Sequence, residues 1–252
     1  MDIVELNCGT LNMRGGEAAF GTDHFVCRVL LIKDGARLIA VDSGIGHAGI
    51  ADPVSRFGKQ WLDLARPALD PDETLKSQVT AHKWDPHSVT DVIVTHHHRD
   101  HVDGLSDFPW ARIHAADECR NVVRDGGAGL VPAQWSHDIV WAPSPRPAPE
   151  WRGFATFTLD GLPNTIRLIA LGGHSPGHVG VLVPTDDHLL LHVGDAFHHH
   201  TQLLSTAPAG VEDFARSVQY DEAERMSTVR KIATLSGDKD IRIVNSHDPS
   251  EV

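Results

Sequence analysis

A short histidine-rich loop carries the spacing His-x-His-x-Asp-His, from His96 to His101. Alternate side chains of an extended loop point the same way, so His96 and His98 can share one metal ion. Asp100 and His101 are then placed to bind a second ion on the other side. Imidazole nitrogen suits zinc and similar transition metals, and a carboxylate adds charge that helps to hold two cations. The same alternation predicts that His97 points away from the ions.

Three further segments end in potential metal ligands. His174 lies in the Gly- and Pro-rich turn 172–178, which follows a strand-like run. Asp195 follows the apolar run 189–193, and its two carboxylate oxygens can each bind one cation. His247 comes after the apolar run 241–244. Ligands at the ends of four strands are typical of a cleft at one edge of a rigid sheet.

This arrangement resembles the metallo-β-lactamase-fold hydrolase superfamily over nearly the whole chain. The resemblance implies two divalent metal ions, with zinc first and manganese, iron or cobalt as the other candidates. It implies seven ligands, namely His96, His98 and His174 for one ion, Asp100, His101 and His247 for the other, and Asp195 bridging both.

The turn Asp42-Ser43-Gly44 matches the early strand-Asp-x-Gly signature of this superfamily. The resemblance implies that Asp42 supports the ligand loop rather than binding metal. His178 closes the turn that holds His174, and we expect it to brace the site.

The resemblance implies hydrolysis of a lactone or other carboxylic ester by a hydroxide that bridges the two metal ions. Zinc β-lactamases that place a cysteine on the second ion have it where this chain has Asp195, so the acyl-homoserine lactonases and related esterases match better. Those lactonases commonly carry a tyrosine three residues after the bridging aspartate, where this chain has His198. We expect His198 to hydrogen-bond the substrate carbonyl and Asp100 to pass a proton to the leaving group. His199 and His200 are either part of the site or solvated loop.

Two other functions remain open on these residues. A phosphoester or organophosphate hydrolase could use the same bridged hydroxide. A metal-binding protein without hydrolytic activity could use the same ligands, because a fold does not guarantee a chemistry.

The elements that position these residues read as two similar strand-rich halves. Strands are expected at 4–6, 25–32, 37–41, 89–94, 111–115, 154–159, 166–171, 179–183, 189–193 and 241–244. Helices are expected at 70–83, 117–124 and 221–235, the first with Asp70 as N-cap and Pro71 at its first position. With the resemblance, these elements predict an α/β fold, a four-layer αββα sandwich that forms a single domain over residues 1–252.

Residues 127–152 contain several prolines and are expected to form a long irregular loop. Trp135, Trp141 and Trp151 lie in or beside this loop. They either wall an apolar substrate pocket or pin the loop to the core.

Composition limits the partners of this chain. The formal net charge of −12 disfavours a nucleic-acid partner, and no apolar run approaches the ~20 residues that span a bilayer. The amino terminus lacks a secretion-signal pattern, and Cys8, Cys27 and Cys119 are too scattered for a disulfide framework. We therefore expect a cytoplasmic enzyme with a small-molecule ester or lactone substrate, without membrane contact. The sequence does not indicate an oligomeric state.

Overall fold

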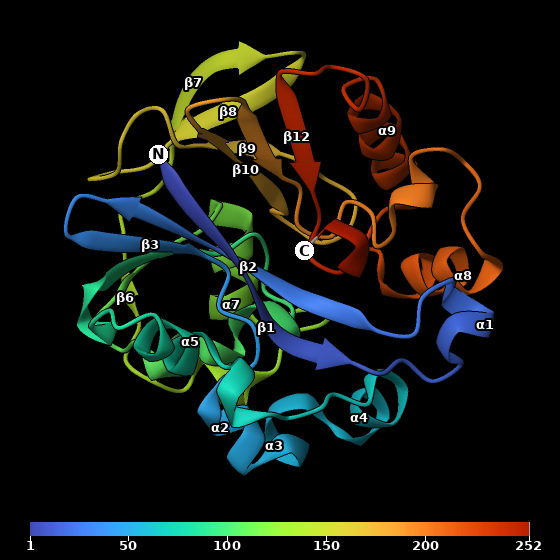
Figure 1. Ribbon diagram of the computed structural model, residues 1–252, viewed down its shortest axis with the longest axis horizontal. Helices are drawn as coiled ribbons and strands as arrows, with labels where there is room; N and C mark the ends of the chain where they lie inside the picture. The colour runs from blue at the N-terminus through green and yellow to red at the C-terminus, as the bar shows by residue number, and fades with distance from the viewer. Residues whose placement is uncertain (252) are drawn as a thin grey trace.

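The computed structural model describes residues 1–251 and contains two six-stranded sheets packed face to face (Figure 1). The first sheet has the order β1-β2-β3-β4-β5-β6, and the second has the order β12-β11-β10-β9-β8-β7. The strands of the first sheet are β1 (Asp2–Leu11), β2 (Phe25–Asp34), β3 (Arg37–Val41), β4 (Val89–Ile93), β5 (Arg112–His114) and β6 (Val140–Trp141). Those of the second are β7 (Arg146–Trp151), β8 (Phe154–Thr158), β9 (Arg167–Ala170), β10 (Val179–Pro184), β11 (Leu189–His192) and β12 (Ile241–Val244).

Helices cover the outer faces and one end of this pair of sheets. The α-helices are α1 (Gly16–Phe20), α2 (His47–Ala51), α3 (Pro53–Phe57), α4 (Lys59–Ala65), α5 (Leu75–Ala81), α6 (Arg99–Val102), α7 (Asp117–Asp125), α8 (Ala209–Val218) and α9 (Glu222–Ala233). Short 3-10 turns are η1 (Pro71–Glu73), η2 (Pro86–Ser88), η3 (Asp103–Asp107), η4 (Pro132–Trp135), η5 (His200–Gln202) and η6 (Pro249–Glu251).

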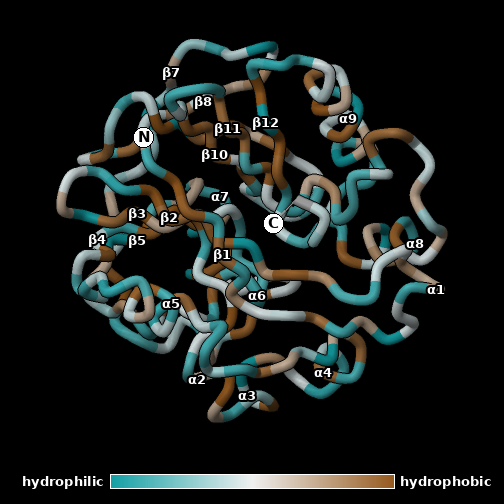
Figure 2. Tube along the Cα trace, in the orientation of Figure 1, coloured by the Kyte–Doolittle hydropathy of each residue, from teal (hydrophilic) through white to brown (hydrophobic). Residues whose placement is uncertain are grey.

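The central strands are apolar on both faces because both faces are covered. In β2, Val29 and Leu31 face one way and pack with residues of α5 and α7, while Leu30 and Ile32 face the other sheet. The layer between the sheets joins these residues to apolar side chains of β9, β10 and β11. Figure 2 shows hydrophobic residues concentrated along these inner strands. The two faces of β2 therefore belong to two different core layers.

The outer face of the second sheet packs against α9. Leu171 and Leu191 contact Val229 and Ile232 of this helix in one buried cluster. A fourth apolar cluster closes the end of the molecule near α1, α4 and α8. Helix, sheet, sheet and helix thus form the four layers of an αββα sandwich, which confirms the predicted fold class.

The predicted strands are all present, and three expectations about helices and loops need correction. The helix expected over 70–83 begins only at Leu75, because Thr74 is extended and its hydroxyl caps α5 by accepting from the Ser77 N–H. Asp70 instead caps η1. The region 127–152 is not one irregular loop, since it contains η4, β6 and β7.

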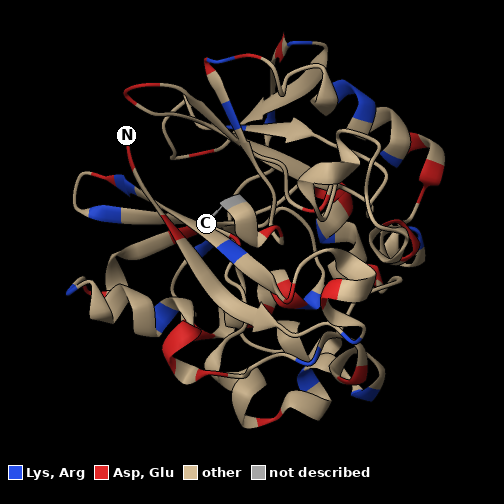
Figure 3. Cartoon of the chain, turned by 45° about the vertical axis from the view of Figure 1, so that its right-hand side comes forward, with Lys and Arg blue, Asp and Glu red and all other residues tan. Residues whose placement is uncertain are grey.

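The tryptophans of that region pack into the core rather than lining a substrate pocket. Trp135 stacks on Trp141 with their rings 5.9 Å apart, and Trp151 stacks on Phe154. These tryptophans therefore hold the segment 127–152 against the sheets, which is the second of the two roles considered from the sequence. Acidic and basic residues are interspersed over the surface (Figure 3), and no described helix is long and apolar enough to cross a membrane.

Candidate metal centre

Four loops leave neighbouring strand ends at one edge of the sandwich and converge on one point. The loop after β4 carries His96, His98 and His101, and the loops after β9, β11 and β12 supply further side chains. Two groups with ligand atoms within 4.8 Å of one another contain the predicted ligands, namely His96, His98, His174 and Asp195, and Asp100, His101 and His247, and a third group joins His198 to Asp195 and His247. The structure therefore brings together every metal-ligating residue that the sequence predicted.

The first group consists of three imidazoles and a carboxylate. His174 Nε2 lies 3.2 Å from His96 Nε2 and 2.9 Å from His98 Nδ1. The same nitrogen lies 3.4 Å from Asp195 Oδ2. Three ring nitrogens and one carboxylate oxygen thus lie within 4.8 Å of one another.

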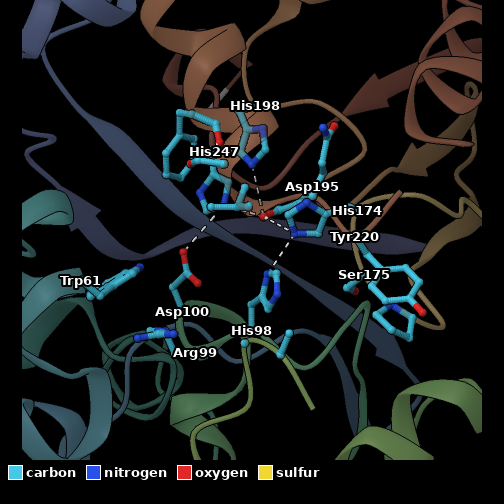
Figure 4. A pocket seen from close by; sticks show the side chains of 17 residues that line it. Trp61, His98, Arg99, Asp100, His174, Ser175, Asp195, His198, Tyr220 and His247 are labelled. Carbon is cyan, nitrogen blue, oxygen red and sulfur yellow. Dashed lines mark hydrogen bonds and ion pairs between the residues drawn. The ribbon is translucent and has the colours of Figure 1, made fainter. Parts of the chain in front are cut away.

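The second group shares Asp195 with the first. Asp195 Oδ1 lies 3.3 Å from His101 Nε2, and Asp195 Oδ2 lies 3.1 Å from His247 Nε2. Asp100 faces the same two histidines, with its oxygens 3.7 Å from His247 Nε2 and 4.0 Å from His101 Nε2. Asp195 therefore contacts both groups, as Figure 4 shows at the centre of the cavity.

Burial controls the charge of the first group. Desolvation lowers the pKa of His96, His98 and His174 well below the usual histidine range, and repulsion from neighbouring histidines lowers it further. Neutral imidazoles keep a nitrogen lone pair, which is the form that binds a metal ion. The group is thus held in its ligating state.

Carboxylates dominate the second group. Burial opposes the charged form of His101 and His247, but the nearby carboxylates together outweigh it and raise the pKa of both: Asp195 and Asp42 for His101, and Asp195 and Asp100 for His247. Burial also opposes the charge on Asp195, while His101 and His247 hold the pKa of that carboxyl well below its usual range. The buried Asp195 carboxylate therefore carries a negative charge that requires positive charge beside it.

The donor set fits divalent metal ions. His101 Nε2 and Asp195 Oδ1 are buried without a hydrogen-bond partner among the described residues. A buried polar atom left unpaired is unfavourable, and histidine and aspartate are ordinary ligands of zinc and related ions. Cations between these atoms would pair lone pairs that otherwise only face each other.

Asp42 anchors the ligand loop from below. One carboxylate oxygen accepts from the Thr95 N–H, and the other accepts from the Thr95 hydroxyl and from His101 Nδ1, each at 2.8 Å. Because Asp42 can only accept, His101 Nδ1 carries a proton, and Nε2 is the nitrogen that can release its proton and bind a metal ion at the centre. Asp42 thus fixes both the backbone and the tautomer, as its motif implied.

The Asp-x-Gly turn has a steric cause. Asp42 adopts a left-handed φ of 61°, and Gly44 adopts a φ of 62°. A Cβ on Gly44 would lie 2.4 Å from the Cys8 carbonyl oxygen, so only glycine fits. The turn directs Asp42 toward the ligand loop at the end of β3.

The His247 loop is clamped by β2. His247 Nδ1 donates to the Val26 carbonyl at 2.8 Å, so Nε2 is the nitrogen that faces the centre. The fully buried Arg28 donates to the carbonyls of Asn245 and Asp248, at 2.7 and 2.6 Å. Arg28 also pairs with Glu5 at 3.0 Å. Sequence patterns alone gave no indication of this clamp.

Two histidines of the motifs lie outside the ligand groups. His97 Nε2 donates to the Ala128 carbonyl at 2.9 Å and points away from the centre. His178 donates from Nδ1 to the Leu171 carbonyl and accepts the Asp195 N–H at Nε2. His178 therefore fixes the backbone of the bridging aspartate.

His198 lies over the centre. It is buried, with Nε2 3.6 Å from Asp195 Oδ2, and its ring stacks parallel to that of His247. Desolvation lowers its pKa, so the ring is neutral near pH 7. His199 caps η5 and His200 pairs with Asp248, and neither lines the cavity.

A cavity of about 370 Å³ opens above the two groups. Its walls come from elements that the sequence did not predict, with Trp61 on α4 and Phe214 on α8. Tyr220, the sole tyrosine, joins the wall because its N–H bonds to the carbonyls of Gly173 and His174. Figure 4 shows Arg99 and Trp61 on one side of the cavity and Tyr220 on the other.

The chain is similar to curated proteins over almost its full length. A probable metallo-hydrolase of Mycobacterium tuberculosis is 31% identical over 98% of this chain and 80% of that protein. This chain belongs to the metallo-β-lactamase-fold hydrolases. It is accordingly a metal-dependent hydrolase. The N-acyl homoserine lactonase AttM of Agrobacterium fabrum is 26% identical over 97% of the chain and 90% of AttM. No family model matches the chain.

Solved structures support the fold of this metallo-hydrolase. A mutant of AiiA from B. thuringiensis, with N-decanoyl-L-homoserine bound at its active site, matches with a TM-score of 0.73 at 14% identity, covering 99% of this chain and 94% of that one. AidC, a dizinc quorum-quenching lactonase, matches with a TM-score of 0.65 at 16% identity, covering 98% and 87%.

Proposed function

We propose that this hydrolase is a dinuclear metalloenzyme that opens a lactone or another carboxylic ester. The observation that carries the proposal is the shared carboxylate, since Asp195 contacts His174 of the first group and His101 and His247 of the second. The first ion would be held by His96, His98 and His174, and the second by Asp100, His101 and His247, with Asp195 bridging. The similarity to AttM, named an N-acyl homoserine lactonase, supports a lactone as substrate.

Two divalent cations in such a pair supply Lewis acidity and activate water near neutral pH. Zinc is the first candidate, because the ligands are histidine and aspartate and the structurally similar AidC is described as dizinc. The protein itself contributes shape, because its cavity admits a small ester beside the two groups.

His198 has the place and the charge state to bind the substrate carbonyl. Its ring lines the cavity, and neither ring nitrogen has a hydrogen-bond partner among the described residues. A neutral imidazole still carries one N–H, which can donate to an oxygen that gains negative charge during acyl transfer. His198 would therefore do what the lactonase tyrosine does at the matching position.

Asp100 has the place to move the proton. It lines the cavity at its floor, with the second oxygen directed at His247. A carboxylate that faces both the centre and the substrate can take a proton at one oxygen and pass it to the departing alkoxide. Asp100 would thus combine ligation with proton transfer.

A substrate panel tests this function. Metal-loaded protein is assayed on an N-acyl homoserine lactone, a simple phenyl ester and nitrophenyl phosphate, together with the Asp195→Ala variant. We expect lactone and ester turnover that the variant loses. Turnover of the phosphate alone would replace the proposal with phosphoester hydrolysis, and bound metal without turnover of any substrate would replace it with metal binding.

A further inference from the structure

The cavity contains one charged side chain that the proposed metal centre does not use. Arg99 lies within the ligand loop, between His98 and Asp100, and its side chain lines the cavity wall next to Trp61 (Figure 4). The remaining charged residues of that lining, Asp100 and Asp195, are proposed ligands. Arg99 is therefore the residue that gives the substrate cavity a positive wall.

Arg99 is held in place without neutralising its charge. One guanidinium nitrogen, Nη1, donates to the Phe57 carbonyl at the end of α3, and the Arg99 carbonyl accepts from Gln134 at 2.9 Å. A guanidinium has five N–H donors, so this bond leaves most of them for other partners. The side chain is thus fixed while its other donors remain available.

Two other arginines with buried or half-buried side chains pair with carboxylates, whereas Arg120 donates to the carbonyls of Ala115 and Ala142. Arg56 contacts Asp103 at 2.7 Å, and Arg112 contacts Asp91 at 2.8 Å. Among the described side chains of residues 1–250, no carboxylate lies at salt-bridge distance from Arg99, although the charge of Asp100 next to it raises the Arg99 pKa against the effect of burial. In the proposed centre the Asp100 carboxylate binds a metal ion, so its charge is already shared. A partly buried guanidinium in this position favours an anionic partner.

The apolar side chains next to Arg99 limit the length of a substrate that could contact both this guanidinium and the metal centre. Trp61 lies beside Arg99, and Phe214 packs against His198 with their ring centroids 5.0 Å apart, so both contribute apolar surface to the cavity wall. They also separate the main cavity from an apolar crevice of about 10 Å³, which is room for about one water and not for an alkyl chain. A long acyl tail therefore finds no room behind Trp61 and Phe214, on the side of the cavity where Arg99 lies.

We propose that Arg99 binds a carboxylate of the substrate, so that the preferred substrates are short esters or lactones with a carboxylate remote from the scissile bond. This inference rests on the proposed ester hydrolase function. The guanidinium would hold that carboxylate through two N–H donors while the ester carbonyl lies over the centre. Arg99 is then a specificity-determining residue.

The test compares charged and neutral esters of equal length. The substrates are the monomethyl esters of succinic, glutaric and adipic acid and the methyl keto esters in which a methyl ketone replaces each carboxylate. The proteins are metal-loaded wild type, Arg99→Met, Arg99→Lys and the control Arg124→Met, which removes an exposed charge outside the cavity. Calorimetry measures binding of glutarate and of butyrate to the same proteins.

We expect at least one monoanionic ester to exceed its keto ester by about tenfold or more in kcat/KM, mainly through KM. Arg99→Met should bring this ratio close to one and weaken glutarate binding relative to butyrate, while Arg99→Lys keeps part of both effects and Arg124→Met keeps both. A ratio near one at every length in the wild type, or an unchanged ratio in Arg99→Met, would overturn the inference and leave ester hydrolysis standing. Glutarate binding that depends on Arg99, with no ester hydrolysed, would keep the anion site and refute the proposed function.

Discussion

The floor and the walls of the cavity are built in different ways. The floor of the cavity consists of the ligand side chains, which lie on loops that leave adjacent strand ends. Two of them are held by a bond to a buried partner, His101 by Asp42 and His247 by the Val26 carbonyl. The walls consist of Trp61, Phe214 and Tyr220, which come from short helices and a loop and are partly or largely exposed. A rigid floor keeps the metal ligands in place, whereas wall residues on separate helices and loops can differ between enzymes with different substrates.

Removing a floor ligand should have the largest effect. We expect His96→Ala to lose one metal ion and nearly all turnover, because His96 shares the first site with His98 and His174. The measurement is metal content together with lactone hydrolysis on the same preparation. His97→Ala is the matched control, because His97 is next to His96 in the chain but its ring bonds to the Ala128 carbonyl instead of facing the centre. Full turnover in His96→Ala would show that this residue is not a ligand.

Weakening the support of the floor should have the next largest effect. Asp42→Asn removes a charge that orients His101, and we expect a loss of roughly 10- to 100-fold in metal affinity. The matched control is Asp91→Asn, which disturbs another buried aspartate–histidine pair, with His114 at 2.8 Å. Both variants should lower the melting temperature, but only Asp42→Asn should weaken metal binding. Equal metal affinities in the two variants would contradict a positioning role for Asp42.

His198 lies where floor and wall meet, and its replacement tests the carbonyl contact. We expect His198→Leu to lower kcat on the order of 100-fold, the effect of losing one donor to a developing oxyanion. His198→Asn, which keeps an N–H donor, should recover part of that loss, and both variants should keep the wild-type metal content. A loss of metal in both variants would instead identify His198 as a ligand, since it lies near Asp195 and His247.

A wall substitution should have the smallest effect. Trp61→Ala removes an apolar contact beside the substrate, and a contact of about 1 kcal/mol corresponds to about a fivefold rise in KM. Trp151→Ala is the control, because this ring stacks on Phe154 away from the cavity. Steady-state kinetics on one ester distinguishes the two. If Trp151→Ala raised KM more than Trp61→Ala did, Trp61 would not be the tryptophan that contacts the substrate.

The same contrast explains what the sequence could predict. The floor was predictable because each ligand follows an apolar strand within a few residues, as His96 follows β4 and Asp195 follows β11. The walls were not, because α4 and α8 begin without a side-chain cap and their contacts join distant parts of the chain. Trp135 and Trp141 were ambiguous for the same reason, since only tertiary packing places them in the core.

The contacts that position the ligand residues were predictable from the sequence only in part. The Asp-x-Gly turn indicated Asp42, but nothing local to Arg28 reveals that its guanidinium reaches the carbonyls of Asn245 and Asp248. Helix boundaries failed where a side chain offered a competing cap, as Thr74 does at α5. Local patterns therefore predicted which residues converge at the centre better than they predicted the contacts that position those residues.

In the proposed function, Asp195 joins two metal ions into one hydrolytic centre. The most direct test is elemental analysis of the wild type and Asp195→Asn, purified without added metal, with lactone opening measured on the same samples. We predict about two ions per wild-type chain with lactone turnover, and fewer ions with little turnover in the variant. One ion per wild-type chain, or an Asp195→Asn protein that keeps both ions and full turnover, would contradict it.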